Sequence, residues 1–69
     1  MQTKKSIEFR RLIEKVGLRR IDIVRYLGIG ERTLYAWQSG HRVVSKSAMI
    51  AMYALAREPL PEKYLDDTI

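Results

Sequence analysis

Three observations predict an all-α fold, a compact bundle of four to five short helices. Apolar residues recur at the three- and four-residue spacing of one helix face. Glycine or proline residues follow these apolar segments, at positions where helices end. A chain of 69 residues makes one domain, residues 1–69, with a small core.

The first helix is predicted at residues 4–16, because Phe9, Leu12, Ile13 and Val16 form one apolar stripe. Ser6 is a candidate cap for this helix, unless the helix begins a turn earlier, and Gly17 ends it. The second helix is predicted at residues 20–27 and buries a face made of Ile23, Val24 and Leu27. Gly28 follows as its left-handed end.

The third helix is predicted at residues 31–38, with Leu34 and Trp37 turned into the core at three-residue spacing. The fourth is predicted at residues 45–57, with Ser45 as its cap and apolar residues on more than one side. Prolines then end the helical pattern. Residues 61–69 are predicted as a short turn over Glu62–Leu65 followed by a frayed tail.

Gly28-Ile29-Gly30 separates two helices that are each too short to be stable alone in water. Two brief helices joined by a tight turn that contains glycine are typical of a helix-turn-helix. Ile29 is apolar in the middle of this turn, so we expect it to point inward and to fix the angle between the helices. Gly30 occupies the cap position of the third helix, where serine, threonine or aspartate would cap more strongly.

Positive charge is concentrated around this motif. The formal net charge is +5 and the sequence pI is about 9.9. Residues 1–46 carry 11 Lys/Arg against 4 Asp/Glu, a net +7, whereas residues 47–69 carry 2 against 4, a net −2. A basic domain meets one criterion for a nucleic-acid-binding protein.

Several classes of protein are disfavoured by composition. The chain contains no cysteine, so it has neither a disulfide framework nor a thiolate metal site. No apolar run approaches the roughly 20 residues that span a bilayer. A cytoplasmic protein without membrane contact, cofactor or metal is therefore expected. An enzyme is not expected, because nothing places Asp22, His41 and Ser45 together as a triad.

The central residues resemble the lambda-repressor-like, or Cro-repressor-like, helix-turn-helix transcriptional regulators. The family pattern has an apolar pair, a Leu-Gly-hydrophobic turn, a Thr-hydrophobic pair, and a polar-x-Gly-basic-basic exit. The matching residues are Ile23-Val24, Leu27-Gly28-Ile29, Thr33-Leu34 and Gln38-Ser39-Gly40-His41-Arg42. The resemblance covers about Phe9 to Leu55 and rests on many coinciding spacings.

The chain departs from the family pattern at three places. Val24 stands where the family usually keeps alanine, and Gly30 replaces the usual serine cap. Arg19 and Arg20 stand where a polar cap and a glutamine are common, which adds charge beside the DNA backbone.

The resemblance implies that the third helix enters the major groove of double-stranded DNA. Arg32 would bind a guanine through both arms of its guanidinium, Tyr35 would contact a thymine methyl or a phosphate, and Glu31 would accept from a cytosine amine. An acidic residue at a helix start is equally explained by the helix dipole. The further implied contacts are to bases for Thr33 and Ala36, and to phosphates for Arg19, Arg20, His41, Arg42 and Lys46. Arg25, Lys4 and Lys5 are second-rank phosphate candidates.

The predicted function is therefore a sequence-specific transcriptional regulator, a Cro-like repressor acting as a homodimer on a pseudo-palindromic operator. The last helix and residues 60–69 are the expected dimer surface, because their apolar residues exceed what the core would absorb. Two alternatives stay open. One is an antitoxin-like regulator that also binds a toxin, and the other is a helix-turn-helix scaffold for protein–protein contact. A protein partner such as a toxin or polymerase is left unspecified.

Overall fold

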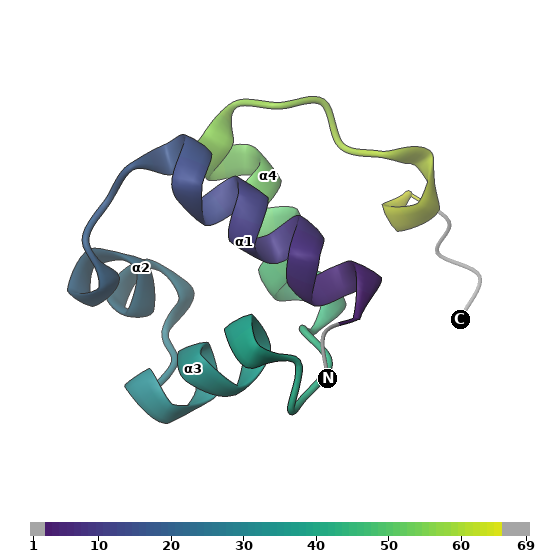
Figure 1. Ribbon diagram of the computed structural model, residues 1–69. Coiled ribbons are helices and arrows are strands. Elements are labelled where there is room, and N and C mark those ends of the chain that lie inside the picture. Colours follow the sequence, from purple (N-terminus) through teal and green to yellow (C-terminus); the bar gives the residue numbers. More distant parts are fainter. Residues whose placement is uncertain (1–2, 66–69) are drawn as a thin grey trace.

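The computed structural model describes residues 3–65, and all regular structure in this range is helical (Figure 1). Five elements follow one another along the chain: α1 (Lys4–Val16), α2 (Arg20–Leu27), α3 (Glu31–Ser39), α4 (Lys46–Ala56) and a 3-10 turn, η1 (Glu62–Tyr64). The all-α prediction is confirmed. Each predicted helix is present with ends that differ by at most one residue, and the tail predicted to fray at residues 66–69 lies outside the described residues.

Helix α1 begins a turn before Ser6, so the second of the two predicted starts is correct. Thr3 is the cap, and its hydroxyl accepts the Ser6 backbone N–H at 3.1 Å. The Ser6 hydroxyl in turn accepts the Thr3 backbone N–H at 2.8 Å. These reciprocal bonds form a capping box, which satisfies two N–H groups that the first helical turn leaves without partners.

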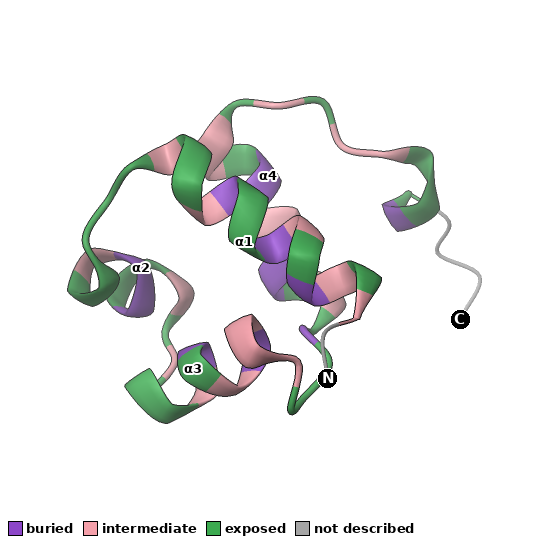
Figure 2. Ribbon diagram, in the orientation of Figure 1, coloured by how far each residue is buried: buried purple, intermediate pink, exposed green. Residues whose placement is uncertain are grey.

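The core lies where α1 packs against α3 and α4 (Figure 2). Phe9 and Trp37 meet edge to face, with ring centroids 5.8 Å apart and ring planes at 89°. Leu12, Leu34 and Met49 are fully buried beside this pair. The predicted inward orientation of Leu34 and Trp37 is confirmed, so α3 turns the opposite side of the helix to solvent.

The segment between α2 and α3 is a tight turn with a left-handed glycine. Gly28 has φ 69°, and its backbone N–H donates to the Val24 carbonyl at 2.8 Å. The Ile29 N–H donates to the same carbonyl at 3.1 Å. Ile29 is partly buried against the core, in agreement with the predicted inward position. The hydroxyl of Tyr26 donates to the Ala51 carbonyl at 2.8 Å, which ties α2 to α4.

The chain after α4 turns back and runs along α1 toward its N-terminal end (Figure 1). Arg57 takes a left-handed conformation with φ 57° to end α4. Tyr64 is buried, and Leu60 packs against the core. The expectation that apolar residues here exceed what the core absorbs is therefore wrong for both residues, because the returning segment covers α1. Leu65 is the exposed large apolar residue of the described tail.

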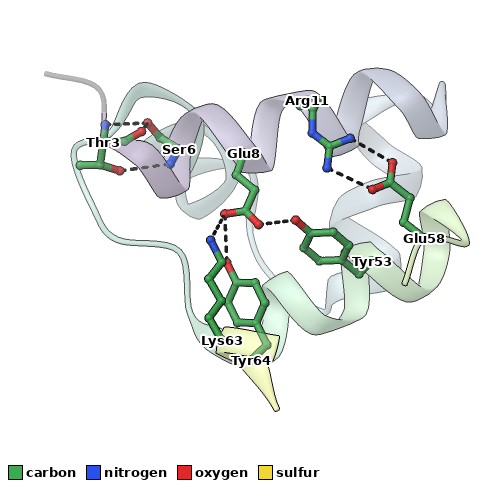
Figure 3. Close-up of polar contacts among 8 residues, drawn as sticks. All are labelled: Thr3, Ser6, Glu8, Arg11, Tyr53, Glu58, Lys63 and Tyr64. Carbon is green, nitrogen blue, oxygen red and sulfur yellow. Dashed lines mark hydrogen bonds and ion pairs between the residues drawn. The ribbon is translucent and has the colours of Figure 1, made fainter. Parts of the chain in front are cut away.

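Two carboxylates on and beside α1 hold this returning segment (Figure 3). Glu58 pairs with the Arg11 guanidinium through two bonds of 2.9 and 3.1 Å and with Lys15 at 2.8 Å. Glu8 accepts hydrogen bonds from Tyr53, from Lys63 at 3.0 Å and from Tyr64 at 3.1 Å. We call this set the tail clamp.

Candidate nucleic-acid interface

The exposed side of α3 carries the residues predicted to contact bases. Glu31, Arg32 and Tyr35 are exposed, and 61% of the Tyr35 surface is accessible. Thr33 and Ala36 are half-buried, so the helix presents less of them. Because Leu34 and Trp37 hold the opposite side in the core, α3 stays fixed while these polar side chains face solvent.

The side chains of Glu31, Arg32 and Tyr35 make no hydrogen bond or ion pair with any residue from 3 to 65. A guanidinium keeps five N–H donors in a planar fork, and here all of them remain for a ligand. The exposed side of α3 thus presents the guanidinium of Arg32, the carboxylate of Glu31 and the phenol of Tyr35 within two helical turns.

The start of α2 adds two adjacent arginines that have different partners. The Arg19 Nε donates to Asp22 Oδ2 at 3.1 Å within the first turn of the same helix. The Arg20 Nη1 donates to Gln38 Oε1 at 3.2 Å, which links the start of α2 to the last turn of α3. Both arginines are exposed.

The loop after α3 brings His41 and Arg42 beside the end of that helix. Gly40 has φ 85°, and the Arg42 backbone N–H reaches back to the Ala36 carbonyl at 3.2 Å. His41 Nδ1 and Ser39 Oγ form a hydrogen bond of 2.7 Å. The Arg42 side chain is exposed and forms no ion pair within the described range.

We call the exposed residues of these three segments the candidate interface: Arg19, Arg20, Glu31, Arg32, Tyr35, His41 and Arg42. Lys46, predicted to bind phosphate, is the half-buried first residue of α4. No hydrogen bond or ion pair in the described chain links the second-rank candidates Arg25, Lys4 and Lys5 to the candidate interface.

Among the residues that the structure describes, every group with a shifted pKa belongs to the tail clamp. Although burial raises the pKa of Glu8, hydrogen bonds from Tyr53, Lys63 and Tyr64 leave it below the ordinary value. Hydrogen bonds from Arg11 and Lys15 lower the pKa of Glu58 to about 2. Burial and the neighbouring Glu8 carboxylate raise the pKa of Tyr64 to about 12. Shifted pKa values often mark functional sites, but ion-pair networks that hold a fold produce them too. Each of these three groups is bonded across the contact between α1 and the chain after α4, so we interpret the tail clamp as structural.

Sequence reasoning missed the clamp and three polar contacts. These are the Tyr26–Ala51, Arg20–Gln38 and Ser39–His41 hydrogen bonds. The Ser39–His41 bond joins residues two apart in the sequence, and the closeness of a serine to a loop histidine could have suggested it. The other two span 18 and 25 residues, and no local pattern pairs residues at such distances.

Two further observations concern ligands and membranes. Among residues 3–65, no three His, Cys, Asp or Glu side chains gather in an arrangement that could hold a metal ion. In the same part of the chain, every helix is too short or too polar to cross a bilayer.

Comparison of the chain with protein-family models, curated proteins and solved structures gives no match.

Proposed function

We propose that this protein is a sequence-specific double-stranded-DNA-binding transcriptional regulator of the helix-turn-helix type. One observation carries the proposal: the side chains of Arg32 and Tyr35 are exposed and have no partner among residues 3–65, on a short helix whose other side is buried in the core. A rigid helix with an unpaired arginine suits the reading of base edges, because the major groove of DNA admits one α-helix.

In the proposed complex, α3 lies in the major groove with its N-terminal part at the base edges. Arg32 binds O6 and N7 of a guanine with both arms of its guanidinium, the commonest specific contact in protein–DNA complexes. Tyr35 lies one turn further along the helix, where its ring contacts a thymine methyl or its hydroxyl a phosphate. Glu31 accepts from a cytosine amine, and Thr33 and Ala36 add smaller contacts at the sides.

Cations on either side of α3 bind the phosphates and set the register of the helix in the groove. Arg20 comes from the start of α2, His41 and Arg42 from the loop after α3, and Lys46 from the start of α4. Backbone hydrogen bonds position two of these segments: the Arg42 N–H donates to the Ala36 carbonyl, and the Asp22 and Ile23 N–H groups donate to the Arg19 carbonyl at the start of α2.

A single module of this size contacts few bases. Useful specificity therefore calls for a homodimer on two half-sites about 34 Å apart, in the arrangement of a pseudo-palindromic operator. Repression by blocking polymerase is the simplest mechanism for such a regulator. Such a regulator acts in the cytoplasm of a prokaryotic cell.

The test is selection of bound fragments from random DNA, followed by gel-shift titration of the selected site at two salt concentrations. We expect an enriched motif that contains guanine and a steep loss of affinity with salt. Arg32→Ala should cost about 1–3 kcal/mol on the selected site and relax the motif at one position.

Arg10→Ala is the matched control, because Arg10 is an exposed arginine on α1, outside the candidate interface. It removes the same charge and should leave the motif unchanged. If the wild-type protein binds no fragment even at low salt, the proposal is wrong, and a protein-binding role becomes the better explanation of the fold.

A further inference from the structure

Arg19 and Arg20 are neighbours in sequence with the same formal charge, yet their partners differ in kind. Arg19 donates from Nε to the carboxylate of Asp22, whereas Arg20 donates from Nη1 to the neutral amide oxygen of Gln38. A carboxylate partner compensates most of the charge of a guanidinium, and an amide partner orients the guanidinium without compensating its charge.

The atoms left free on the two guanidinium groups differ too. The bond from Nη1 to Gln38 leaves the Nε–Nη2 edge of Arg20 without a partner among the described residues, and this edge can bind two oxygens of one phosphate. On Arg19, Nε is already bound to Asp22, so the corresponding edge is engaged. Arg20 is therefore the better phosphate ligand of the pair, in both charge and geometry.

We propose that Gln38 is a positioning residue that presents the Arg20 guanidinium to a DNA phosphate, while Asp22 keeps Arg19 out of that role. This inference rests on the proposed function. Arg32 lies in the first turn of α3 and Gln38 in the last. The same helix therefore carries the arginine that contacts a base and the glutamine that orients Arg20. The Arg20–Gln38 hydrogen bond thus sets the position of the phosphate-binding guanidinium of Arg20 relative to the base-contacting Arg32.

Preorganisation predicts a specific pattern of effects. Holding a long side chain in its bound orientation reduces the entropy lost on binding. Gln38→Ala removes that restraint but leaves the charge of Arg20, so affinity should fall about two- to tenfold. The slope of log K against log salt should stay unchanged, because the same number of phosphates is neutralised.

Three further variants separate orientation from charge. Arg20→Ala should reduce the salt slope by about 0.9, the contribution of one phosphate contact. Gln38→Glu gives Arg20 a carboxylate partner and should move the slope toward that of Arg20→Ala. Asp22→Asn releases Arg19 and should increase the slope.

The experiment is a double-mutant cycle of Arg20→Ala and Gln38→Ala on the selected site, titrated over a series of salt concentrations. Thermal unfolding of each variant serves as the control for folding. We expect Gln38→Ala to weaken binding in the wild-type background and to have no effect once Arg20 is alanine.

Equal losses in both backgrounds would overturn the inference, since Gln38 would then act without Arg20. A reduced salt slope for Arg19→Ala with an unchanged slope for Arg20→Ala would overturn it as well. Either result leaves the proposed function standing as long as the wild-type protein binds its site in a salt-dependent way. Failure of the wild-type protein to bind DNA is the distinct result that removes both.

Discussion

The two sides of this small bundle use their charged residues differently. Along α1 and the returning tail, Glu8 and Glu58 together bind three cations and two tyrosine hydroxyls. On the α2–turn–α3 side, Arg32 and Arg42 are exposed and meet no carboxylate of the described chain.

This difference separates charges that hold the fold from charges that remain for a ligand. A cation paired with a carboxylate has most of its field compensated, and its effect is to keep the tail on α1. An exposed unpaired arginine contributes little to stability, but it can release counterions from a polyanion. The net charge of +5 does not distinguish these two roles, and the partners of each side chain do.

The largest expected effect concerns the core that both sides share. Trp37→Ala should cost about 3–5 kcal/mol in the free energy of unfolding, because it removes the ring that packs on Phe9 and leaves a cavity. Urea unfolding followed by circular dichroism measures the loss. Tyr35→Ala, on the exposed side of the same helix, should unfold like the wild type. A folded Trp37→Ala protein that loses only DNA binding would show that Trp37 belongs to the interface.

The second-largest effect on the free energy of unfolding is expected for the tail clamp. Glu8→Ala leaves the hydroxyls of Tyr53 and Tyr64 without their acceptor and should cost about 1–3 kcal/mol in the free energy of unfolding. Glu14→Ala is the matched control, because Glu14 is an exposed carboxylate on the same helix without a partner in the described chain. Equal losses for the two variants would show that Glu8 stabilises the fold no more than an exposed carboxylate without a partner does.

The clamp should also make stability depend on pH. The folded-state pKa of Glu58, about 2, lies below its ordinary value of 4.5, so the unfolded chain takes up a proton first as pH falls. The stabilisation is complete above pH 4.5 and is lost as pH falls toward about 2. Burial raises the pKa of Tyr64 to about 12, so its contribution is complete below pH 10 and is lost as pH rises through about 12.

Unfolding midpoints measured across these two ranges test the direction of each effect. Glu58→Gln should flatten the acid side, and Tyr64→Phe should flatten the alkaline side. If Glu14→Gln flattens the acid side as much as Glu58→Gln does, the acid sensitivity does not come from the clamp.

The smallest effect is expected for one phosphate contact on the other side of the molecule. Arg42→Ala should weaken binding to all DNA sequences alike and reduce the salt slope by about 0.9, while the free energy of unfolding stays close to the wild-type value. Gel-shift titrations of a selected and a random fragment measure both quantities. A loss confined to the selected fragment would instead assign Arg42 to base reading.

The sequence by itself determined the helices, their ends and the buried side of α3. Side chains three and four residues apart lie on the same helix face, so Leu34 and Trp37 had to be buried together whatever they packed against. Glycines that tolerate a positive φ end α1, α2 and α3 for an equally local reason. The α3 part of the candidate interface followed from the same rule, because Glu31, Arg32 and Tyr35 lie on the side of α3 that Leu34 and Trp37 leave exposed.

Only the tertiary structure decided which charges are paired. Arg11 and Arg32 are both arginines on amphipathic helices, but Arg11 meets Glu58, 47 residues away, and Arg32 meets no carboxylate in residues 3–65. Glu8 likewise binds groups that lie 45 to 56 residues further along the chain. Such pairs depend on how the helices pack and where the chain after α4 returns. Periodicity reports which face of one helix is buried, and it carries no information about what lies opposite that face.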